Sequence, residues 1–544
     1  MEEIKAPTEE IEKADEPEKD NMSEIAGEPA EEKKEQFFTK EKFRKFLNCY
    51  GHLLWIGGLV FLFLTVCSTC SFIYPMNEWV DSNVYFTIGK AMLGGKVLYR
   101  DIFDQKGPYL FMAHSFAYLI SHRSFIGVYL LELVLAFVFA YAEYRILLLY
   151  IEKKYALISL PVVMFASYAT YAFVYGDSAE EFTLPFMALS LFFLLEFTKG
   201  KKMSLIRYGL VGAFTSYTLW IKFTLCGFYF AWALLMLIFE LKDKNYKHLL
   251  LGIAAFFGAF FVLCIPVLIY FGVNHALGDL WEAYFYRNIF VYTSGTDGQN
   301  TGFARKLFWP IWMFIRSIGY GYTFYILIIP GFVFLALSKE FTRREKAAIF
   351  TAYAVMNFII YVGGRGGKYY GLPVNIFSFI GIVAISKVKF TAKMWNFLFK
   401  KFFIVAGVST AVFAGLSIAI NPLRYMVFSK KSSRVQYKFA KLIEEYPSGN
   451  IIDYGALDLG VHTATDTFPD CKYYFKPNMA LPVVMETQNE WVREGKADYV
   501  VSTAPLPDEI DDKYELIATG RQFADSIYED YYLYRLIALR QEGK

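Results

Sequence analysis

The chain contains uninterrupted apolar runs of about 20 residues, and these runs constrain its fold more strongly than any other feature. A helix that crosses the ~30 Å core of a bilayer needs about 20 predominantly apolar residues. Hydrophobic residues make up 56% of the 544 residues, and they gather in runs rather than on one face of each element. We therefore expect a polytopic α-helical membrane protein with about eleven transmembrane helices. The expected spans are 53–74, 125–149, 155–175, 182–198, 205–221, 223–241, 249–272, 318–338, 347–363, 371–387 and 402–420.

The charged loops between these runs predict the orientation of the chain. Short basic clusters alternate along the sequence with a second set of loops, and the positive-inside rule places basic clusters in the cytoplasm. We therefore expect residues 1–50 to be cytoplasmic and residues 421–544 to be external. The basic clusters lie at 152–154, 199–202, 242–247, 339–346 and 387–401, and the loops expected outside lie at 75–124, 176–181, 273–317 and 364–370.

Three parts follow from this pattern. Residues 1–50 are expected to form a disordered acidic tail and a basic juxtamembrane segment. Residues 51–420 are expected to form a transmembrane domain, with a first external loop at 75–124. Residues 421–544 mix helix-like and strand-like segments, so we expect a small external α/β domain. Outside the spans, helices are predicted at 82–93, 107–121, 432–446 and 482–495, and strands at 450–455, 497–502, 514–518 and 531–536.

The first external loop combines a carboxylate with cations beside the membrane. Asp81 precedes a predicted helix, so it is either the N-cap of that helix or a general base that takes a proton from an attacking hydroxyl. Lys106 and Arg100 are candidate phosphate ligands, and the alternative for Lys106 is a lysine that snorkels toward the interface. A carboxylate base beside a phosphate clamp is what sugar transfer from a lipid-phosphate carrier requires.

A second group of acids lies in the short loop before the fourth expected span. Asp177, Glu180 and Glu181 are all in this loop. Ser178 and Glu181 have the spacing of a capping box, and so do Asp177 and Glu180. At least one of these acids is expected to cap the helix. Capping does not account for all of them, so Glu180 and Glu181 are candidate catalytic residues and Asp177 is a weaker substrate-binding candidate. One of them could hold a divalent metal ion together with Asp81.

A glycine-rich loop near residue 365 supplies further candidates. Arg365 offers a bidentate fork for a phosphate, and Lys368 adds a second cation on the side expected to be external. Tyr369 and Tyr370 follow directly and are weaker substrate-binding candidates. Arg287, in another external loop, is also weak, because the aromatic residues around it either stack on sugars or mark the membrane interface.

Other polar residues are less informative. Lys222 lies between two apolar runs and is expected to snorkel to the outer surface. No two of the six histidines are spaced as metal ligands, so a histidine-based zinc site is not expected. The sequence has no zinc-finger, Walker or dinucleotide motif, and no nucleic-acid partner is expected.

The pattern over about residues 50–420 resembles the bacterial membrane glycosyltransferases of the GT-C superfamily. Within that superfamily it resembles the family 39 group, which includes protein O-mannosyltransferases and lipid A aminoarabinose transferases. The resemblance rests on the acid after the first span, on the Phe-Asp-Gln-Lys-Gly-Pro segment at 103–108, on the acidic loop before Leu-Pro-Phe at 184–186, and on the external tail. It implies a multi-pass protein of the bacterial plasma membrane.

The resemblance also implies roles for particular residues. Asp81 matches the catalytic base of the first external loop, and Lys106 matches a lysine that contacts the carrier phosphate, although Gly107 here separates it from the proline. Glu180 matches an acid of the second external loop, with Glu181 as the alternative register. The family pattern has an Asp-Glu pair in the first loop where this chain has Asp81 followed by serine, so a two-carboxylate metal site there is not supported.

A mechanism follows from the resemblance. The donor is expected to be a polyprenyl-phosphate monosaccharide, and the acceptor a cell-envelope glycan, polymer or lipid, with inversion at the anomeric carbon. A divalent metal is left open as a cofactor. The alternative function is a transporter or flippase of a lipid-linked saccharide, which would place polar residues near the midplane of several spans. Here the charges gather at the outer rim.

Overall fold

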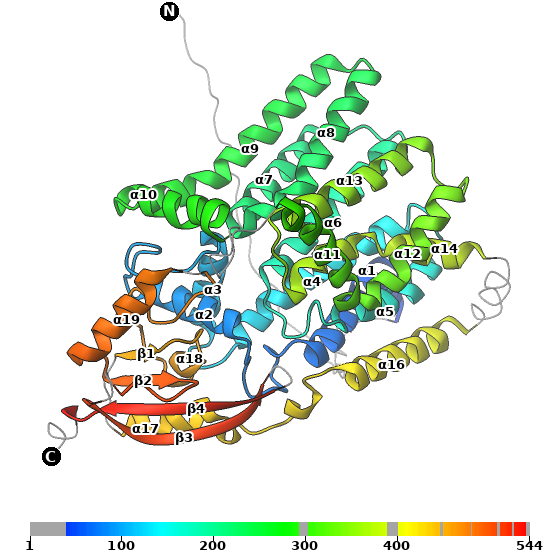
Figure 1. Ribbon diagram of the computed structural model, residues 1–544. Coiled ribbons are helices and arrows are strands. Elements are labelled where there is room, and N and C mark those ends of the chain that lie inside the picture. The colour runs from blue at the N-terminus through cyan, green and yellow to red at the C-terminus, as the bar shows by residue number, and fades with distance from the viewer. Residues whose placement is uncertain are drawn as a thin grey trace, which may run out of the picture. The chain divides into compact units, whose positions relative to one another are not determined.

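The structure is a computed structural model that describes residues 40–292, 303–388, 401–445, 450–479, 481–508, 512–524 and 527–539 (Figure 1). The chain comprises two units, Met1–Gly51 and His52–Lys544. In the first unit the structure describes residues 40–51, where helix α1 (Lys40–Cys67) begins. The acidic tail expected before residue 40 lies outside the described residues.

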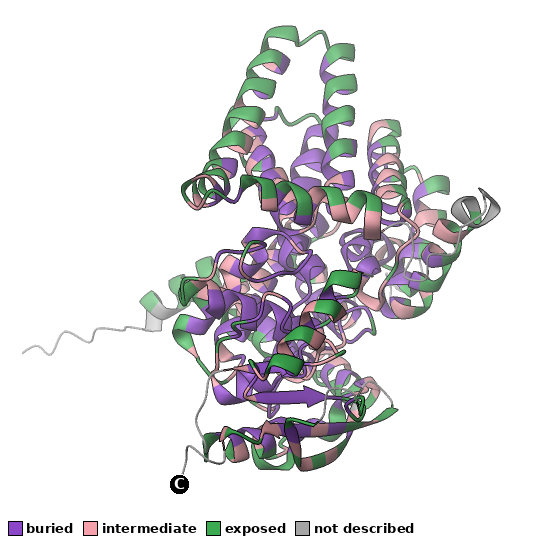
Figure 2. Cartoon of the chain, turned by 60° about the vertical axis from the view of Figure 1, so that its left-hand side comes forward, coloured by how far each residue is buried: buried purple, intermediate pink, exposed green. Residues whose placement is uncertain are grey.

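Long helices make up most of the second unit, and many of their apolar side chains are exposed. Figure 2 shows buried residues where helices meet and exposed residues along outward faces. Helices α9 and α16 are strongly apolar, but only 17% of the residues in the apolar stretch of each helix are buried. Their outward faces therefore suit lipid rather than water. The long helices after α1 are α4 (Ile126–Leu147), α5 (Lys153–Tyr168), α6 (Ala179–Thr198), α7 (Leu205–Lys222), α8 (Gly227–Lys242), α9 (Tyr246–Val273), α11 (Phe303–Tyr320), α12 (Tyr322–Leu337), α13 (Arg343–Tyr361), α14 (Phe379–Lys387) and α16 (Phe402–Ile420).

Six helical segments of the described residues are long and apolar enough to cross a membrane, or eight if two bent pairs each count as one span. The eleven expected runs exceed this number for three physical reasons. Leu205–Lys242 contains two of those runs, which the extended backbone at Lys222 (φ −160°, ψ 101°) divides into α7 and α8. Helix α5 has only 16 residues, and the first turn of α13 is rich in charge.

Short helices connect the long ones on the side where the candidate residues gather. Helices α2 (Val80–Leu93) and α3 (Pro108–Ile120) form the first loop, as predicted. They approach closely at Gly89, where a Cβ atom would lie 2.8 Å from the Cβ of His114. The remaining short elements are η1 (Phe223–Cys226), α10 (Leu277–Leu280), the π-helix η2 (Trp281–Val291) and η4 (Lys368–Phe377).

The C-terminal residues form a four-stranded sheet with helices. The sheet order is β1-β2-β4-β3, in which β1 pairs parallel with β2 and the other pairs are antiparallel. The four strands and two helices that the sequence predicts after residue 421 are all present and overlap their predicted ranges. The elements are η6 (Arg424–Met426), η7 (Lys431–Ser433), α17 (Val435–Glu444), β1 (Ile451–Asp453), α18 (Val461–Thr465), α19 (Pro482–Glu494), β2 (Tyr499–Ser502), β3 (Tyr514–Ala524) and β4 (Ile527–Leu536).

The C-terminal elements cover α2. Lys90 on α2 is fully buried, and its ammonium donates a 2.5 Å hydrogen bond to the carbonyl of His462 on α18. Burial lowers the pKa of Lys90 to about 8, against the opposing effect of Asp466. Phe103 in the first loop also donates its backbone N–H to the carbonyl of Lys472. The first loop and the C-terminal elements therefore pack directly against each other.

Candidate active site

Asp81 lies in the first turn of α2 and not at its N-cap, which is Trp79. The carboxylate accepts a 3.0 Å hydrogen bond from the Tyr369 hydroxyl and a longer one, 3.4 Å, from Tyr85. Its Oδ2 is also 3.9 Å from Nζ of Lys106. The structure gives Asp81 no capping hydrogen bond, so the N-cap alternative is wrong and the carboxylate faces groups that suit a base.

The backbone around Lys106 fixes the position of its side chain. The hydroxyl of Tyr99, a residue with a positive φ of 67°, donates a 2.5 Å hydrogen bond to the carbonyl of Lys106. The next residue, Gly107, fits tightly against the end of α7, since a Cβ atom there would be 2.0 Å from the carbonyl oxygen of Trp220. The glycine between lysine and proline is thus what lets the loop bring Lys106 toward the end of α7.

Lys106 stays charged in its buried position. Burial alone would lower the pKa of its ammonium, but the neighbouring Tyr85, Asp81 and Asp104 raise it well above the usual value. The ammonium also lies 5.6 Å from the centre of the Tyr85 ring, a cation–π distance. Only 12% of the lysine side chain and 9% of the Asp81 side chain are exposed. A charged lysine beside a carboxylate with little water can bind an anion strongly.

A second carboxylate–lysine pair lies close by. Nζ of Lys222 is 2.6 Å from Oε1 of Glu180, a residue that is fully buried. The same ammonium lies 3.5 Å from the centre of the Tyr370 ring and 5.4 Å from that of Tyr369. The prediction that Lys222 snorkels to the surface is wrong, because its side chain turns inward to Glu180. The partner is 42 positions away in sequence, and no local pattern could have identified it.

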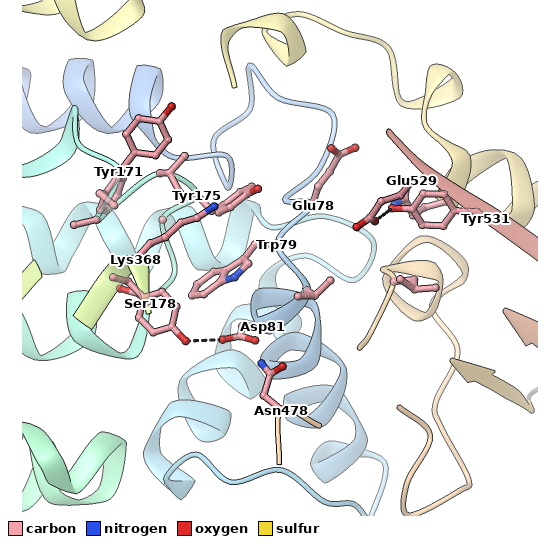
Figure 3. A pocket seen from close by; sticks show the side chains of 18 residues that line it. Glu78, Trp79, Asp81, Tyr171, Tyr175, Ser178, Lys368, Asn478, Glu529 and Tyr531 are labelled. Carbon is pink, nitrogen blue, oxygen red and sulfur yellow. Dashed lines mark hydrogen bonds between the residues drawn. The ribbon is translucent and has the colours of Figure 1, made fainter. Parts of the chain in front are cut away.

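The tyrosines of η4 connect the two pairs. Tyr369 donates to Asp81, and Tyr370, which follows it, lies under Lys222. A cavity of about 310 Å³ opens beside them and is lined by Asp81, Ser178, Lys368 and Tyr369 among others (Figure 3). The side chain of Glu180 is not among the described residues that line it. Asp81 therefore faces the cavity, while Glu180 lies behind the tyrosines.

Asp177 and Glu181 belong to a buried network that holds the helices together. His114 Nε2 lies 2.9 Å from Asp177 Oδ1, and the Ser82 hydroxyl donates to the same carboxylate. The backbone N–H of Asp177 donates to Glu132 and to Glu181, at 2.9 and 2.8 Å. The network joins α2, α3, α4 and α6, and so fixes the residue next to Asp81.

The capping prediction for this loop is confirmed in part, because the N-cap is Ser178 and not one of the acids. The Glu181 side chain accepts the backbone N–H of Asp177. Ser178 is the N-cap of α6, and its hydroxyl accepts a 3.1 Å hydrogen bond from the N–H of Glu181. The left-handed backbone of Asp177 (φ 63°) turns the chain into this cap. Glu180 and Glu181 are therefore both in the first turn of the helix, where their different directions send one toward Lys222 and the other into the buried network.

The remaining predicted cations lie at different distances from this cluster. Lys368 lines the cavity. Arg365 donates from Nε to the carbonyl of Tyr292, over whose ring its guanidinium lies at 4.5 Å. Arg287 pairs with Glu282 and stacks on Phe103.

Contacts with neighbouring loop residues hold the side chain of Arg100. Its guanidinium forms hydrogen bonds with the neighbouring Asp101 and with the carbonyl of Asn274, and 44% of its side chain is exposed. Asp104, which the sequence analysis did not select, is buried close to Lys106, and burial raises the pKa of its carboxyl.

The carboxylates suit lysine partners better than a metal. Across the part of the chain that the structure describes, no three His, Cys, Asp or Glu side chains are grouped as a metal site. Asp81 and Glu180, the pair considered for a divalent ion, each have a lysine as the nearby cation, Lys106 and Lys222. The donor set of this site therefore does not fit a two-carboxylate metal centre.

The fold is similar to that of known membrane transferases. No protein-family model matches the chain, and no curated protein matches its sequence. The crystal structure of ArnT from Cupriavidus metallidurans bound to undecaprenyl phosphate is 10% identical, with a TM-score of 0.58, and the match covers 91% of this chain and 99% of ArnT. For apo ArnT the TM-score is 0.57 at 10% identity, and the match covers 90% and 99%.

An archaeal oligosaccharyltransferase, AglB from Archaeoglobus fulgidus in complex with an inhibitory peptide and a dolichol-phosphate, also matches. It is 10% identical, with a TM-score of 0.48, over 84% of this chain and 70% of AglB. ArnT is a GT-C transferase. The likeness to ArnT over nearly the whole of both chains shows that this protein shares the fold of ArnT, which belongs to the superfamily that the sequence resembles.

Proposed function

We propose that the protein is a membrane glycosyltransferase that moves a monosaccharide from a polyprenyl-phosphate carrier to a hydroxyl of a cell-envelope acceptor. The observation that carries the proposal is the 3.9 Å approach of Lys106 to Asp81, a residue that lines the cavity. Glycosyl transfer from a phosphate carrier needs a base for the acceptor and positive charge for the leaving phosphate, and this pair supplies both. That ArnT binds undecaprenyl phosphate supports the choice of carrier.

The reaction in this proposal is a single displacement. The acceptor oxygen attacks the anomeric carbon of the donor, and its proton passes to the carboxylate of Asp81. The bond between the anomeric carbon and the phosphate oxygen breaks, and the electron pair leaves with the carrier phosphate. The sugar is transferred with inversion. Tyr369 and Tyr85 hold the carboxylate by donating to it, so it meets the acceptor already oriented.

The lysines stabilise the departing phosphate. Lys106 is the nearest cation to Asp81, and Lys222 is the second, held by Glu180 over the Tyr370 ring. In this proposal Glu180 is a positioning residue for Lys222. Lys368 lies at the cavity wall and, together with Arg365, extends the positive region. Low exposure strengthens each of these interactions, because the screening by water is reduced.

The same proposal includes the topology. Residues 1–50 would be cytoplasmic, residues 51–420 would cross the bacterial plasma membrane eleven times, and the C-terminal α/β domain at 421–544 would be external. The charge distribution of the loops supports this arrangement. It puts the cavity on the outer face, where lipid-linked rather than nucleotide-linked sugars are the available donors.

The experiment that tests the function uses purified full-length protein in lipid vesicles. Polyprenyl-phosphate hexoses with a radiolabelled sugar are supplied with a cell-envelope extract, and labelled product is counted for wild type and for Asp81→Asn. Asp101→Asn is the matched control, because Asp101 is a partly exposed acid in the same loop that does not line the cavity. The proposal requires product from wild type and from the control but not from Asp81→Asn. Movement of intact donor across the bilayer, equal in wild type and Asp81→Asn and without a covalent product, would favour the flippase alternative.

A further inference from the structure

The cavity beside Asp81 extends from the transmembrane part to the C-terminal domain. Its lining comes from the start of α2, the loop before α6, the start of η4, and the C-terminal residues Gln436, Leu459, Asn478, Glu529 and Tyr531. Figure 3 shows Lys368 and Tyr175 on one side and Glu529 and Tyr531 on the opposite side, with Glu78 between them. At about 310 Å³ it is at the lower end of the ~300–1,000 Å³ range of small-molecule sites. It can hold a saccharide unit but not a folded segment of another protein.

The charges around this cavity are unequally distributed. Among the described residues that line it, three are acids, Glu78, Asp81 and Glu529, and one is a base, Lys368. The lysine is on the side of η4, where the proposed donor phosphate binds. The acids Glu78 and Glu529 lie away from it. A second phosphate or a carboxylate entering on that side would meet like charge in a partly buried site, which is unfavourable.

Glu78 lines the cavity, and one of its carboxylate oxygens has unused hydrogen-bonding capacity. Only 4% of its side chain is exposed, and its Oε1 pairs with Arg434 and accepts a 2.7 Å hydrogen bond from Gln522. Its Oε2 is buried and has no hydrogen-bond partner in the described part of the chain. A buried carboxylate oxygen without a donor is costly unless a ligand or water supplies one. Arg434 pairs with Glu78, and Lys106 lies beside Asp81. Among the described residues that line the cavity, Glu529 therefore contributes the negative charge that these cations do not balance.

Aromatic and amide groups complete the lining. Trp79 and Tyr175 stack with ring centres 6.0 Å apart and an interplanar angle of 10°, and both line the cavity. Aromatic surfaces of this kind pack against the apolar faces of sugar rings. Asn478 and Gln436 add amide groups, and Tyr531 donates a 3.1 Å hydrogen bond to Glu529. Acceptor-only carboxylates beside amides match the many O–H donors of a carbohydrate.

We propose that this cavity is the acceptor subsite, and that it takes a hydroxyl-rich saccharide unit that carries neither phosphate nor carboxylate. The inference rests on the proposed transferase function and narrows the acceptor to a neutral glycan. The lysine side of the cavity receives the anionic donor, and the acidic side receives the uncharged acceptor. The two substrates are therefore sorted by charge, and the acceptor hydroxyl is directed to Asp81.

Two soluble probes of equal length test the proposal. One is a neutral trisaccharide, and the other is the same trisaccharide with a phosphate on its terminal sugar. Binding of each to the full-length protein in detergent is measured by calorimetry. We expect the neutral probe to bind at least ten times more tightly than the phosphorylated one. Equal or tighter binding of the phosphorylated probe, or no binding of either, would overturn the proposal.

A matched pair of variants tests whether the preference for the neutral over the phosphorylated probe comes from the cavity. Glu529→Gln should reduce the preference for the neutral probe at least threefold, because it removes one negative charge from the lining. Asp530→Asn makes the same change of charge at the next residue, which is 54% exposed and outside the lining, and should leave the preference unchanged. If both variants have the same effect, the discrimination does not come from the cavity. Thermal unfolding of each variant confirms that it is folded.

Hydrolysis of the labelled donor separates this inference from the proposed function. Donor hydrolysis without selective binding of the neutral probe would leave the transferase proposal standing and reject the acceptor subsite. Selective binding that depends on Glu529, in a protein that neither hydrolyses nor transfers the donor, would support a neutral-glycan site and reject the transferase.

Discussion

The Tyr369 hydroxyl donates a 3.0 Å hydrogen bond to Oδ2 of Asp81 across 288 positions of sequence. Tyr369→Phe removes this donor and should lower turnover about tenfold, since a hydrogen bond to a charged group contributes roughly 1.5–3 kcal/mol. Affinity for the donor should change little. Steady-state kinetics with a labelled donor measures both. Tyr85→Phe is the comparison, because it removes the longer 3.4 Å bond and keeps the ring beside Lys106; an equal or larger loss there would contradict the assignment.

Lys106→Met should weaken donor binding as well as turnover. The phosphate is charged in the ground state and in the transition state, so a lysine that contacts it stabilises both. We expect at least a tenfold rise in the dissociation constant of a polyprenyl phosphate, measured by calorimetry. Lys96→Met is the control, because Lys96 is a partly exposed lysine of the same loop that pairs with Asp470. Unchanged affinity in Lys106→Met would remove this lysine from the phosphate site.

Glu180 and Lys222 should behave as a coupled pair. Each single change, Glu180→Gln or Lys222→Met, leaves a buried charge without its partner and should lower the midpoint of thermal unfolding. The double variant should be more stable than the sum of the two losses predicts. Unfolding temperatures of the four proteins give the coupling. Additive losses would show that the 2.6 Å contact does not join the two residues in solution.

Glu78 should make stability depend on pH. Burial raises the pKa of its carboxyl from 4.5 to about 7, although Arg434 opposes the shift. A carboxyl with a raised pKa contributes stability below pH 4.5 that is lost as the pH rises through about 7. The shift corresponds to at most roughly 3 kcal/mol. In Glu78→Gln this dependence is absent, so the variant should gain a few degrees relative to wild type between pH 5 and 8.

The unfolding temperatures of wild type and Glu78→Gln, followed over this pH range, test the assignment. The variant lacks the ion pair with Arg434 at every pH, so this loss shifts its unfolding temperature by a constant amount. A difference between the two proteins that does not vary with pH would contradict the raised pKa of Glu78.

The proposed topology predicts where added cysteines react. In a background with the exposed Cys49 replaced by serine, Lys513→Cys should be labelled in intact cells by a membrane-impermeant reagent. Lys244→Cys, in a basic cluster expected inside, should be labelled only after the cells are opened. Labelling of Lys244→Cys in intact cells, or protection of Lys513→Cys there, would contradict the eleven-span arrangement.

The sequence predicted helices and strands well where glycine or proline marks an end of an element that also has a regular apolar pattern. Gly94 and Gly95 mark the end of α2 at Leu93, and Pro108 begins α3, as the sequence indicated. The strands of the C-terminal domain lie where β-branched and aromatic residues alternate with turns. The number of spans was harder to predict, because a break such as the extended backbone at Lys222 depends on contacts made elsewhere.

The site was predicted in part. Asp81, Lys106, Lys368 and Tyr369 were each selected for their chemistry, and the structure brings them to one region. Lys222 was missed, because its partner is distant in sequence. Arg100 was selected because it is a cation in the first loop. In the folded chain its guanidinium forms hydrogen bonds with the adjacent Asp101, a contact that the sequence alone did not predict.

Lys90 is covered by residues that lie much later in the chain. Its ammonium binds the carbonyl of His462, 372 positions later in the chain. During translation, the face of α2 that carries Lys90 lacks this contact until the segment around His462 has been made. Asp81 lies in the first turn of the same short helix. A chain that stopped after the last transmembrane helix would therefore lack the contacts that hold this helix from the C-terminal side. The packing of the first loop is therefore completed by a segment that follows all of the expected transmembrane helices.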